Sequence, residues 1–467
     1  MPKRNLLLLT LITAMSLVAW LARDHGRQAR QVGEVLGAIE RSYLEPVDTA
    51  DLAAAAMEGI VATLDEHSAI VAGSARRELE AALDQEFGGV GLELVTAPEG
   101  AVVHAPVVGG PAWRAGIRAG DAIVSIDGAD VRGMSVRDMV GILRGDAGST
   151  VAVGLRRQSA GPEIDGANPA DQSRVVTLVR EVVRTDSVLG DRRLPDGAWD
   201  WFIEGEPGVG FVRITSFGDR TPAELDAALA AIAVAPGVRG LVIDLRGNPG
   251  GLLNAAIDVC DRFVDDGVIV ATRRRGPRDA AVVEPRRATP GAVLVGVPIV
   301  VLIDGLTASA AEIVAACLQD HARAVVVGSR SFGKGTVQSI VPLSDGSRLL
   351  KLTTAEYLRA DDSGIHRRDG SATWGVAPDV GHEIDVTGQT LAALQAWRRQ
   401  RDSAHVAGEA AASAGDLPRS MDPVLARALE ALPLPGADLR GQEEAAGDAD
   451  EAVSAGDPAG AGDGFGG

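Results

Sequence analysis

Near the N-terminus, apolar residues recur every three to four positions in segments 28–43, 52–64 and 75–83. This spacing gives each segment one apolar face, which is typical of amphipathic helices that pack against a core. The pattern therefore predicts a helical N-terminal region over residues 24–86.

Between residues 87 and 183 the pattern changes to short apolar runs separated by turn residues. Such runs predict strands, here at 90–95, 101–107, 122–126, 150–155 and 175–179. One helix is predicted over 135–143, and the polar, Gly- and Pro-containing stretch 158–173 is predicted to be a loop. These features indicate a small, strand-rich domain.

From about residue 186 to 384, apolar runs of strand length alternate with helical patterns. The predicted strands are 208–214, 238–245, 268–272, 297–303 and 324–328, and the predicted helices are 223–232, 252–264 and 310–318. Such alternation is typical of a layered α/β core. Two further helices, 390–401 and 422–432, are expected outside the main sheet.

The first residues form a continuous apolar run, from Asn5 to Ala22, behind a short basic flank. The run is longer than the roughly 7 to 15 apolar residues of a signal peptide and close to the lower limit for a spanning helix. It predicts a signal peptide or N-terminal membrane anchor over residues 1–23, with no cysteine after it for lipid attachment. We expect a cell-envelope protein, anchored or secreted, with its body in the periplasm or outside the cell.

Charge and composition exclude several function classes. The net charge of −19 argues against nucleic-acid binding. Residues 436–467 are rich in Gly, Ala, Asp and Glu, which predicts a disordered acidic tail. Cys260 and Cys317 fall in apolar helical segments without metal-ligand spacing, and the seven histidines are scattered. Buried free thiols are the usual state of such cysteines, and a disulfide is the alternative in an oxidising compartment. We expect no metal and no cofactor.

A serine and a lysine with small neighbours stand out as candidate chemistry. Ser309 follows the predicted strand 297–303 and opens a helix, so helix N–H groups would face the site. Lys334 lies among glycines and could act as a base if burial lowered its pKa. Ser309 and Glu312 also fit the S-x-x-E capping box of ordinary helices, and spacing alone favours that structural role.

A glycine turn provides a third candidate segment. Asp244 lies near the end of the predicted strand 238–245, and the chain then turns through residues 246–251 before the next helix. Glycines let a backbone approach a substrate and present free N–H groups, as an oxyanion hole requires. By itself the same segment is more typical of a tight strand-to-helix turn.

Taken together, these segments resemble the C-terminal processing, or tail-specific, peptidases, a family of Ser/Lys serine endopeptidases. The resemblance covers roughly residues 30 to 385. It is carried, in order, by Leu64–Ser68, Phe87–Leu92, Arg246–Gly251, Thr307–Ile313, Phe332–Gln338 and Gly375–Asp379.

The resemblance implies a role for each matching residue. Ser309 would be the nucleophile, Lys334 the general base, and Gln338 the residue that hydrogen-bonds and orients the lysine. The oxyanion hole would use the N–H groups of Ala310 and of Gly250 or Gly251. The chain departs from many members at two places, with alanine at 311 in place of a second serine and aspartate at 304 in place of asparagine.

The strand-rich segment resembles a bacterial PDZ domain. A peptide could add as a strand beside residues 91–95. Its terminal carboxylate would be held by backbone N–H groups of Gly89, Val90, Gly91 and Leu92. In the resembled family this domain captures apolar C-terminal tails, and the N-terminal helices can mediate a homodimer. Arg180, at the junction with the core, is expected to be a solvated surface residue.

The resemblance implies a multidomain α/β protein with a helical N-terminal region, a bacterial-type PDZ domain and a ClpP/crotonase-like α/β catalytic core. The expected boundaries are 1–23 for the signal peptide or anchor, 24–86 for the helical region, 87–183 for the PDZ domain, 184–385 for the peptidase core, 386–435 for C-terminal helices and 436–467 for the tail.

Other functions compete with this interpretation. Residues 328–334 satisfy most of a phosphate-binding P-loop, but Gly335 stands where such a loop needs Ser or Thr for magnesium. A crotonase-type acyl-thioester enzyme would share the glycine-supplied oxyanion hole, and a catalytically silent PDZ scaffold would share the domain order. A Ser-His-Asp hydrolase would need a histidine beside Ser309, and His321 lies one helix away. The intact Ser309, Lys334 and Gln338 favour the peptidase.

Overall fold

The computed structural model describes residues 26–97, 100–157, 173–402 and 422–432. The predicted anchor, most of the predicted loop 158–173 and the acidic tail lie outside these residues. The chain divides into two compact units, Met1–Arg76 with Gln338–Thr354, and Arg77–Val337 with Ala355–Gly467. None of the helices in the described ranges is long and apolar enough to cross a membrane.

The first unit consists of helices and a small antiparallel sheet. Its elements are α2 (Arg27–Ser42), α3 (Thr49–Val61), β1 (Ala69–Ala72), the start of α4 (Gly73–Asp84), most of β19 (Thr336–Pro342) and the first part of β20 (Arg348–Leu358). Strand β1 pairs with residues 348–351, and β19 pairs with β20. Ser68 Oγ donates to Asp65 and accepts the Thr353 N–H at 3.1 Å, so Ser68 has a structural role.

The strand-rich domain belongs to the second unit and has its own hydrophobic core. Its elements are β2 (Glu86–Gly89), β3 (Leu92–Ala97), β4 (Gly100–Pro106), α5 (Pro111–Arg114), β5 (Asp121–Ile126), β6 (Ala129–Asp130), α6 (Val136–Leu143), β7 (Thr150–Arg157), β8 (Ser173–Val179) and β9 (Glu181–Arg184). The main sheet is antiparallel in the order β3-β4-β5-β7-β8, with β6 paired to β5. Fully buried Met139 and Val153 help to form its core.

The structure differs from the predicted strand 90–95, and it also contains a strand at the junction around Arg180, where none was predicted. The chain turns at Gly91, whose φ of +70° suits glycine, so a short strand β2 precedes β3. Strand β2 then pairs antiparallel with β9, which occupies most of that junction. The junction is therefore a two-stranded ribbon rather than a loop.

The prediction that Arg180 is a solvated surface residue is wrong. Arg180 is 9 % exposed. Its guanidinium donates to the carbonyls of Leu143 and Ile142 at the end of α6, and to Ser149 Oγ and the Thr150 carbonyl. Burial of a guanidinium is tolerated because its donors are satisfied here. Arg180 thus fastens α6 to the β7 edge inside the domain.

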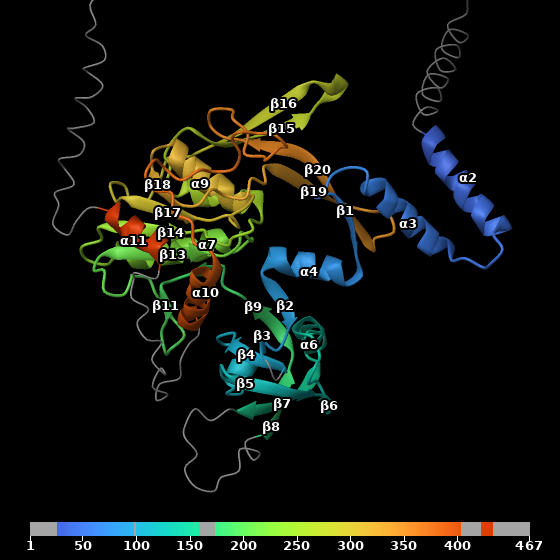
Figure 1. Ribbon diagram of the computed structural model, residues 1–467, viewed down its shortest axis with the longest axis horizontal. Coiled ribbons are helices and arrows are strands. Elements are labelled where there is room, and N and C mark those ends of the chain that lie inside the picture. The colour runs from blue at the N-terminus through green and yellow to red at the C-terminus, as the bar shows by residue number, and fades with distance from the viewer. Residues whose placement is uncertain (1–25, 98–99, 158–172, 403–421, 433–467) are drawn as a thin grey trace, which may run out of the picture. The chain divides into compact units, whose positions relative to one another are not determined.

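A parallel sheet forms the centre of the second unit (Figure 1). Its order is β10-β13-β14-β17-β18, and only β10 is antiparallel to its neighbour. The elements of this layer are β10 (Val188–Leu189), β13 (Val209–Ile214), α7 (Thr221–Ala233), β14 (Gly240–Asp244), α8 (Leu253–Asp261), β17 (Ile299–Ile303), α9 (Ala310–Asp320) and β18 (Ala324–Gly328).

Both faces of this sheet are buried. Alternate residues of one strand point to opposite faces, so Leu241 and Ile243 pack with α7, α8 and α9, whereas Val242 packs with α11 (Pro423–Glu430). Cover on both faces explains why the strands are continuous apolar runs. It also confirms the predicted α/β core.

The remaining elements lie at the margins of the core. They are β11 (Arg192–Arg193), β12 (Trp199–Asp200), β15 (Val268–Arg275), the 3-10 turn η2 (Pro277–Asp279), β16 (Ala281–Arg287) and α10 (Gly388–Asp402). Strand β15 pairs with β16 and with residues 355–358 of β20. Cys260 and Cys317 are free and buried, as predicted.

Candidate active site

The turn that carries Ser309 has an unusual backbone. Ser309 follows β17, precedes α9 and has φ 56° and ψ −118°. A positive φ is rare for a residue with a Cβ and is held only where neighbouring contacts determine it. Ser309 is 8 % exposed. Its hydroxyl is therefore fixed at the N-terminus of a helix, where partial positive charge gathers.

Glu312 ties this turn to the segment that carries Lys334. Its carboxylate is 0 % exposed. One oxygen, Oε2, accepts the N–H groups of Ser309 and Lys334, both at 2.8 Å. The other, Oε1, accepts Ser331 Oγ at 2.5 Å and the Gly333 N–H at 2.6 Å. Burial raises the pKa of the Glu312 carboxyl, and these donors act against that rise.

The capping-box interpretation of Ser309 and Glu312 is therefore only part of the account. Glu312 does accept the Ser309 N–H, as the box requires. The same carboxylate, however, also gathers donors from the loop 331–334, more than 18 residues away along the chain. A helix cap and a link between two candidate catalytic segments coexist in one side chain.

The loop before β19 is held closely on its other side. The Phe332 N–H donates to the Thr307 carbonyl at 2.9 Å, and the Tyr357 N–H donates to the Gly335 carbonyl at 2.7 Å. A Cβ on Gly335 would come within 2.3 Å of the His366 nitrogen. Only glycine fits at position 335. The same residue rules out a P-loop, which needs Ser or Thr there.

The predicted oxyanion turn lies against the Ser309 turn. A Cβ on Gly250 would come 2.8 Å from the Ser309 Cβ and 2.9 Å from the Ala310 nitrogen. The Gly250 N–H already donates to Asn248 Oδ1 at 2.8 Å. Among the described residues, the N–H groups of Gly251 and Ala310 take part in no such hydrogen bond. These two N–H groups therefore have no main-chain acceptor in the described part of the chain.

Asn248 organises this turn, a role that could not be predicted from the sequence. It is 0 % exposed. Its Nδ2 donates to the Ile214 carbonyl at 2.7 Å, its Oδ1 accepts from Gly250, and its carbonyl accepts the Ala308 N–H at 2.9 Å. One residue thus connects the end of β13, the glycine turn and the nucleophile turn.

Asp304 connects the same two loops from the solvent side. Its Oδ1 accepts the N–H groups of Gly247 at 2.9 Å and of Leu306 and Thr307 at 3.0 Å. An ionised carboxylate only accepts hydrogen bonds, which suits three converging N–H donors. The departure from asparagine at this position is therefore compatible with the turn.

Tyr357 is a residue near Ser309 that sequence reasoning missed. Its side chain is 4 % exposed, and its hydroxyl lies near the Ser309 side chain. Burial raises the pKa of Tyr357 to about 12, and the Ser309 hydroxyl acts in the opposite direction. The hydroxyl therefore keeps its proton at neutral pH. Its position in β20, some 50 residues from Ser309, left no local signal in the sequence.

Gln338 belongs to the first unit, in β19. Its Nε2 donates to Thr353 Oγ1 at 3.3 Å. Thr353 Oγ1 in turn donates to Asp65 Oδ1 at 3.2 Å. The amide is thus anchored in a polar chain on β20, and its predicted hydrogen bond to Lys334 stays a prediction.

The predicted carboxylate loop of the PDZ domain has a defined conformation. The Val90 carbonyl accepts the Ala112 N–H at 3.0 Å, and the Gly91 carbonyl accepts the Val107 N–H at 2.9 Å. Gly89 ends β2 and Leu92 begins β3. Within the described ranges, the N–H groups of Val90 and Gly91 donate no main-chain hydrogen bond. No group of acidic, histidine or cysteine residues in those ranges is arranged to hold a metal ion.

Comparison with protein-family models separates the α/β core from the strand-rich domain in the same way. Residues 208–382 match the model of peptidase family S41, and residues 102–157 match a PDZ domain model. The first match contains Ser309, Lys334 and the turn at Gly250 and Gly251.

Comparison with individual proteins covers more of the chain. It is 32 % identical over 373 residues to a carboxy-terminal-processing protease of Bartonella bacilliformis, covering 79 % of this chain and 78 % of the relative. It is 33 % identical over 385 residues to a chloroplastic C-terminal processing peptidase of Tetradesmus obliquus, with 79 % and 77 % covered. Among solved structures, a photosystem II D1 C-terminal processing protease matches at 28 % identity and a TM-score of 0.41, covering 80 % of this chain and 97 % of the other.

Proposed function

The chain belongs to peptidase family S41, among the carboxy-terminal-processing proteases, and from this premise we propose that Ser309 is its nucleophile and Lys334 its general base. Membership makes the protein a serine-type peptidase of the C-terminal processing kind, with a PDZ domain that binds peptide. The observation that carries the assignment of residues is the Glu312 carboxylate, which holds the backbones of Ser309 and Lys334 on the same oxygen.

The proposed reaction proceeds through an acyl-enzyme. Neutral Lys334 takes the proton of the Ser309 hydroxyl as Ser309 Oγ attacks the scissile carbonyl carbon. Lys334 then gives that proton to the leaving amine, and a water molecule, activated in the same way, hydrolyses the ester. Preorganisation of Ser309 at φ 56° supports this role, because strain of this kind is common at reactive residues.

For the oxyanion hole we favour the N–H groups of Ala310 and Gly251. The hydrogen bonds in this region support that choice, because the Gly250 N–H is engaged by Asn248. Gly250 would then serve a steric role, since any side chain there would collide with the nucleophile turn. Gln338 is proposed to orient Lys334 from β19, four residues further along the chain.

Substrate capture is assigned to the PDZ domain. A free C-terminal carboxylate would accept the N–H groups of Gly89, Val90, Gly91 and Leu92, while the peptide lies beside β3 as an added strand. The open N–H groups of Val90 and Gly91 support this assignment. The substrate class is protein or peptide with an apolar C-terminus.

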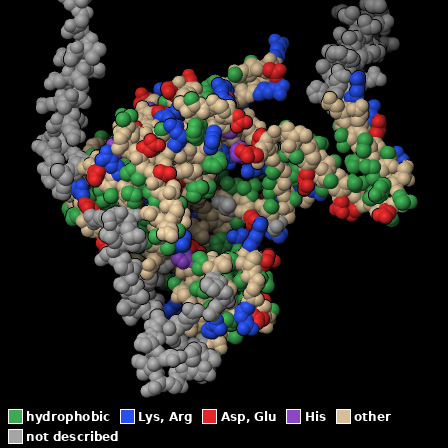
Figure 2. Space-filling view, viewed as in Figure 1, with side chains coloured by type: hydrophobic (Ala, Val, Ile, Leu, Met, Phe, Trp, Pro, Cys, Tyr) green, Lys and Arg blue, Asp and Glu red, His purple; other side chains and the backbone are tan. Residues whose placement is uncertain are grey.

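Location and assembly follow from the N-terminal part. The apolar run 5–22 supports a membrane anchor or signal peptide, which would place the catalytic body outside the cytoplasm. Helices α2 and α3 and the turn between them expose large apolar side chains, visible as a green surface around these helices (Figure 2). They are Val32, Val35, Tyr43, Leu44 and Ile60. This exposure supports a homodimer through the N-terminal helices.

The dyad is tested by substitution. Ser309→Ala and Lys334→Ala should each abolish cleavage of a peptide with an apolar C-terminus, at unchanged thermal unfolding, because each removes one half of the proton transfer. Lys334→Arg should also be inactive, since a guanidinium stays protonated and cannot act as a base.

Ser363→Ala and Lys351→Arg make the same chemical changes at sites outside the proposed machinery, and both should keep full activity. Turnover by well-folded Ser309→Ala or Lys334→Arg at the wild-type rate would refute the dyad.

A further inference from the structure

A cavity of about 660 Å³ lies between α10 and the carboxyl ends of the parallel strands. Asp244 and Ile303, the last residues of β14 and β17, form part of its wall, and Leu394 and Arg398 of α10 form another part. The volume lies within the range of small-molecule sites, and the carboxyl edge of a parallel sheet is where such sites often occur. None of the proposed catalytic residues lines it.

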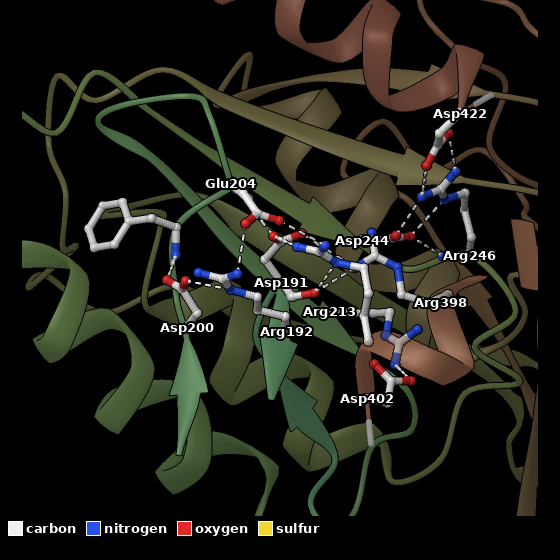
Figure 3. Close-up of polar contacts among 12 residues, drawn as sticks. Asp191, Arg192, Asp200, Glu204, Arg213, Asp244, Arg246, Arg398, Asp402 and Asp422 are labelled. Carbon is white, nitrogen blue, oxygen red and sulfur yellow. Dashed lines mark hydrogen bonds and ion pairs between the residues drawn. The ribbon is translucent and has the colours of Figure 1, made fainter. Parts of the chain in front are cut away.

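Charged side chains surround one end of this cavity in a buried network (Figure 3). Arg246 forms paired hydrogen bonds with Asp244 and with Asp422, all between 2.7 and 3.0 Å. Arg213 donates to Asp402 at 2.5 Å. In this part of the network each cation meets at least one carboxylate directly.

Arg398 is the exception at the cavity wall. It is 7 % exposed, and its Nη1 donates to the Asp191 carbonyl at 3.1 Å, with the Asp191 carboxylate further off at 3.5 Å. Its Nη2 is buried and has no hydrogen-bond partner among the described residues, and the same is true of Arg213 Nε. Burial, with nearby Arg213 and Arg246, lowers the pKa of the Arg398 guanidinium. A buried donor left unpaired is costly, so this end of the cavity lacks an anion.

The rest of the wall is mostly apolar. It includes Leu306, Ile384, Val386, Leu391 and Val424. A fully polar anion such as phosphate would leave this surface uncovered, and a neutral apolar molecule would leave Arg398 Nη2 unpaired. A ligand with an anionic head and a short apolar body satisfies both parts of the cavity.

We propose that this cavity binds a small apolar carboxylate, whose head pairs with the Arg398 guanidinium at the wall and whose apolar body packs against Leu391 and Leu394. Two sources share this chemistry. One is a short free fatty acid, and the other is the C-terminal residue of a peptide. The site is distinct from the PDZ carboxylate loop and from the Ser309 turn.

The cavity wall connects with the active-site loops. Gly247 and Leu306 line it, and Asp304 Oδ1 accepts the N–H groups of both. Gly247 begins the turn that leads to Gly251, and Leu306 lies three residues before Ser309. A bound carboxylate would therefore contact the backbone segments that hold the oxyanion turn and the nucleophile.

The test uses the full chain and calorimetric titration with four soluble probes. Hexanoate and hexanamide represent the fatty acid and its uncharged twin, and N-acetyl-leucine and N-acetyl-leucinamide represent the peptide terminus. We expect at least one acid to bind saturably and about tenfold more tightly than its amide, because only the acid pairs with a buried charged donor. Preference for hexanoate identifies the fatty-acid source, and preference for N-acetyl-leucine the peptide source.

Variants locate the binding. Gln395→Glu adds a negative charge at the cavity wall and should weaken the acid about tenfold, whereas Ala396→Glu, exposed on the same helix outside the cavity, should not. Arg398→Lys should also weaken it, and the Gln395 and Ala396 pair decides the matter if that variant does not fold. Ser309→Ala should bind normally. Amides that bind as well as acids, no saturable binding, or equal effects of the two glutamates would overturn the proposal.

Discussion

Ser309 and Tyr357 form a pair of hydroxyl groups whose chemistry depends on one proton. Tyr357 keeps its proton at neutral pH because burial raises its pKa to about 12. A protonated Tyr357 that donates to a lone pair of Ser309 Oγ would direct the serine proton away from the tyrosine. That arrangement would leave the serine proton available to a base on the other side, which is the position proposed for Lys334.

Tyr357→Phe should therefore lower kcat about tenfold while KM and the unfolding temperature change little, because the ring remains and a single hydrogen bond of ordinary strength is lost. Steady-state kinetics with a peptide substrate measures the split between kcat and KM. Tyr43→Phe removes the other tyrosine hydroxyl, at a side chain that is 59 % exposed, and should leave both constants unchanged. A Tyr357→Phe enzyme with wild-type kcat would show that the hydroxyl only fills space.

At the scale of elements, Glu312 joins the first turn of α9 to the loop that precedes β19. Glu312→Gln keeps the shape of the side chain but replaces one acceptor oxygen with an N–H₂ group that faces N–H donors. Loss of acceptors for buried donors costs about 1 to 3 kcal/mol for each group left unpaired. We expect a lower unfolding temperature together with a fall in kcat of at least tenfold, as the two loops lose their common anchor.

The two effects on Glu312→Gln can be separated by measuring activity well below the unfolding temperature of the variant. Wild-type kcat under those conditions would mean that Glu312 stabilises the fold without positioning the loops. Burial raises the pKa of this carboxyl, so the unfolded chain releases the proton at lower pH than the folded chain does. The contribution of Glu312 to the stability of the fold is therefore fully present below the unfolded pKa. It is lost as the pH rises through the folded pKa.

Gly335 tests the closeness of the loop to its neighbours. Gly335→Ala would place a Cβ 2.3 Å from the His366 nitrogen, so the backbone around Lys334 must shift. We expect a loss of activity of about a hundredfold, because a displacement near 1 Å at reacting groups has an effect of that size. Gly364→Ala, where no atom lies within 4 Å of the added Cβ, is the matched control and should remain active. Equal activities would contradict tight packing of the loop.

Periodicity alone predicted most long elements, because the strands of the parallel sheet are buried on both faces and the helices carry one apolar face. It failed for β2 and β9, whose pairing depends on a contact between residues about 95 positions apart. It also failed for Arg180, since a charged side chain is buried only when distant carbonyls satisfy it. Within the proposed site, Ser309 and Lys334 are predicted from motifs, and their roles stay predictions. Asn248 and Tyr357 could not, because their partners come together only in the fold.

At the scale of the whole molecule, the two proposed carboxylate sites would have different consequences. The PDZ loop at Gly89 to Leu92 would select the substrate, whereas the cavity at Arg398 would respond to a small ligand beside the active-site loops. A two-site arrangement of this kind separates the choice of protein from the chemistry at the scissile bond. It also predicts that removal of one carboxylate requirement leaves the other intact.

The substrate arm of this arrangement is tested with a pair of peptides that share one cleavage site and an apolar C-terminus, one a free acid and the other an amide. The free acid should be cleaved at least tenfold more efficiently in kcat/KM, because the amide cannot supply a charged acceptor to the N–H groups of Val90 and Gly91. Gly91→Val is the matched variant. It is strained, because Gly91 has a φ of +70° and an added Cβ would lie 3.4 Å from Val107 and Val183. This change should reduce the preference for the acid without changing the cleavage of the amide. Gly116→Val, at a φ of +70° but with no atom within 4 Å, controls for backbone strain alone. If the intact enzyme cleaves acid and amide at equal rates, the PDZ loop does not read the terminal carboxylate, and substrate selection must lie in the catalytic core itself.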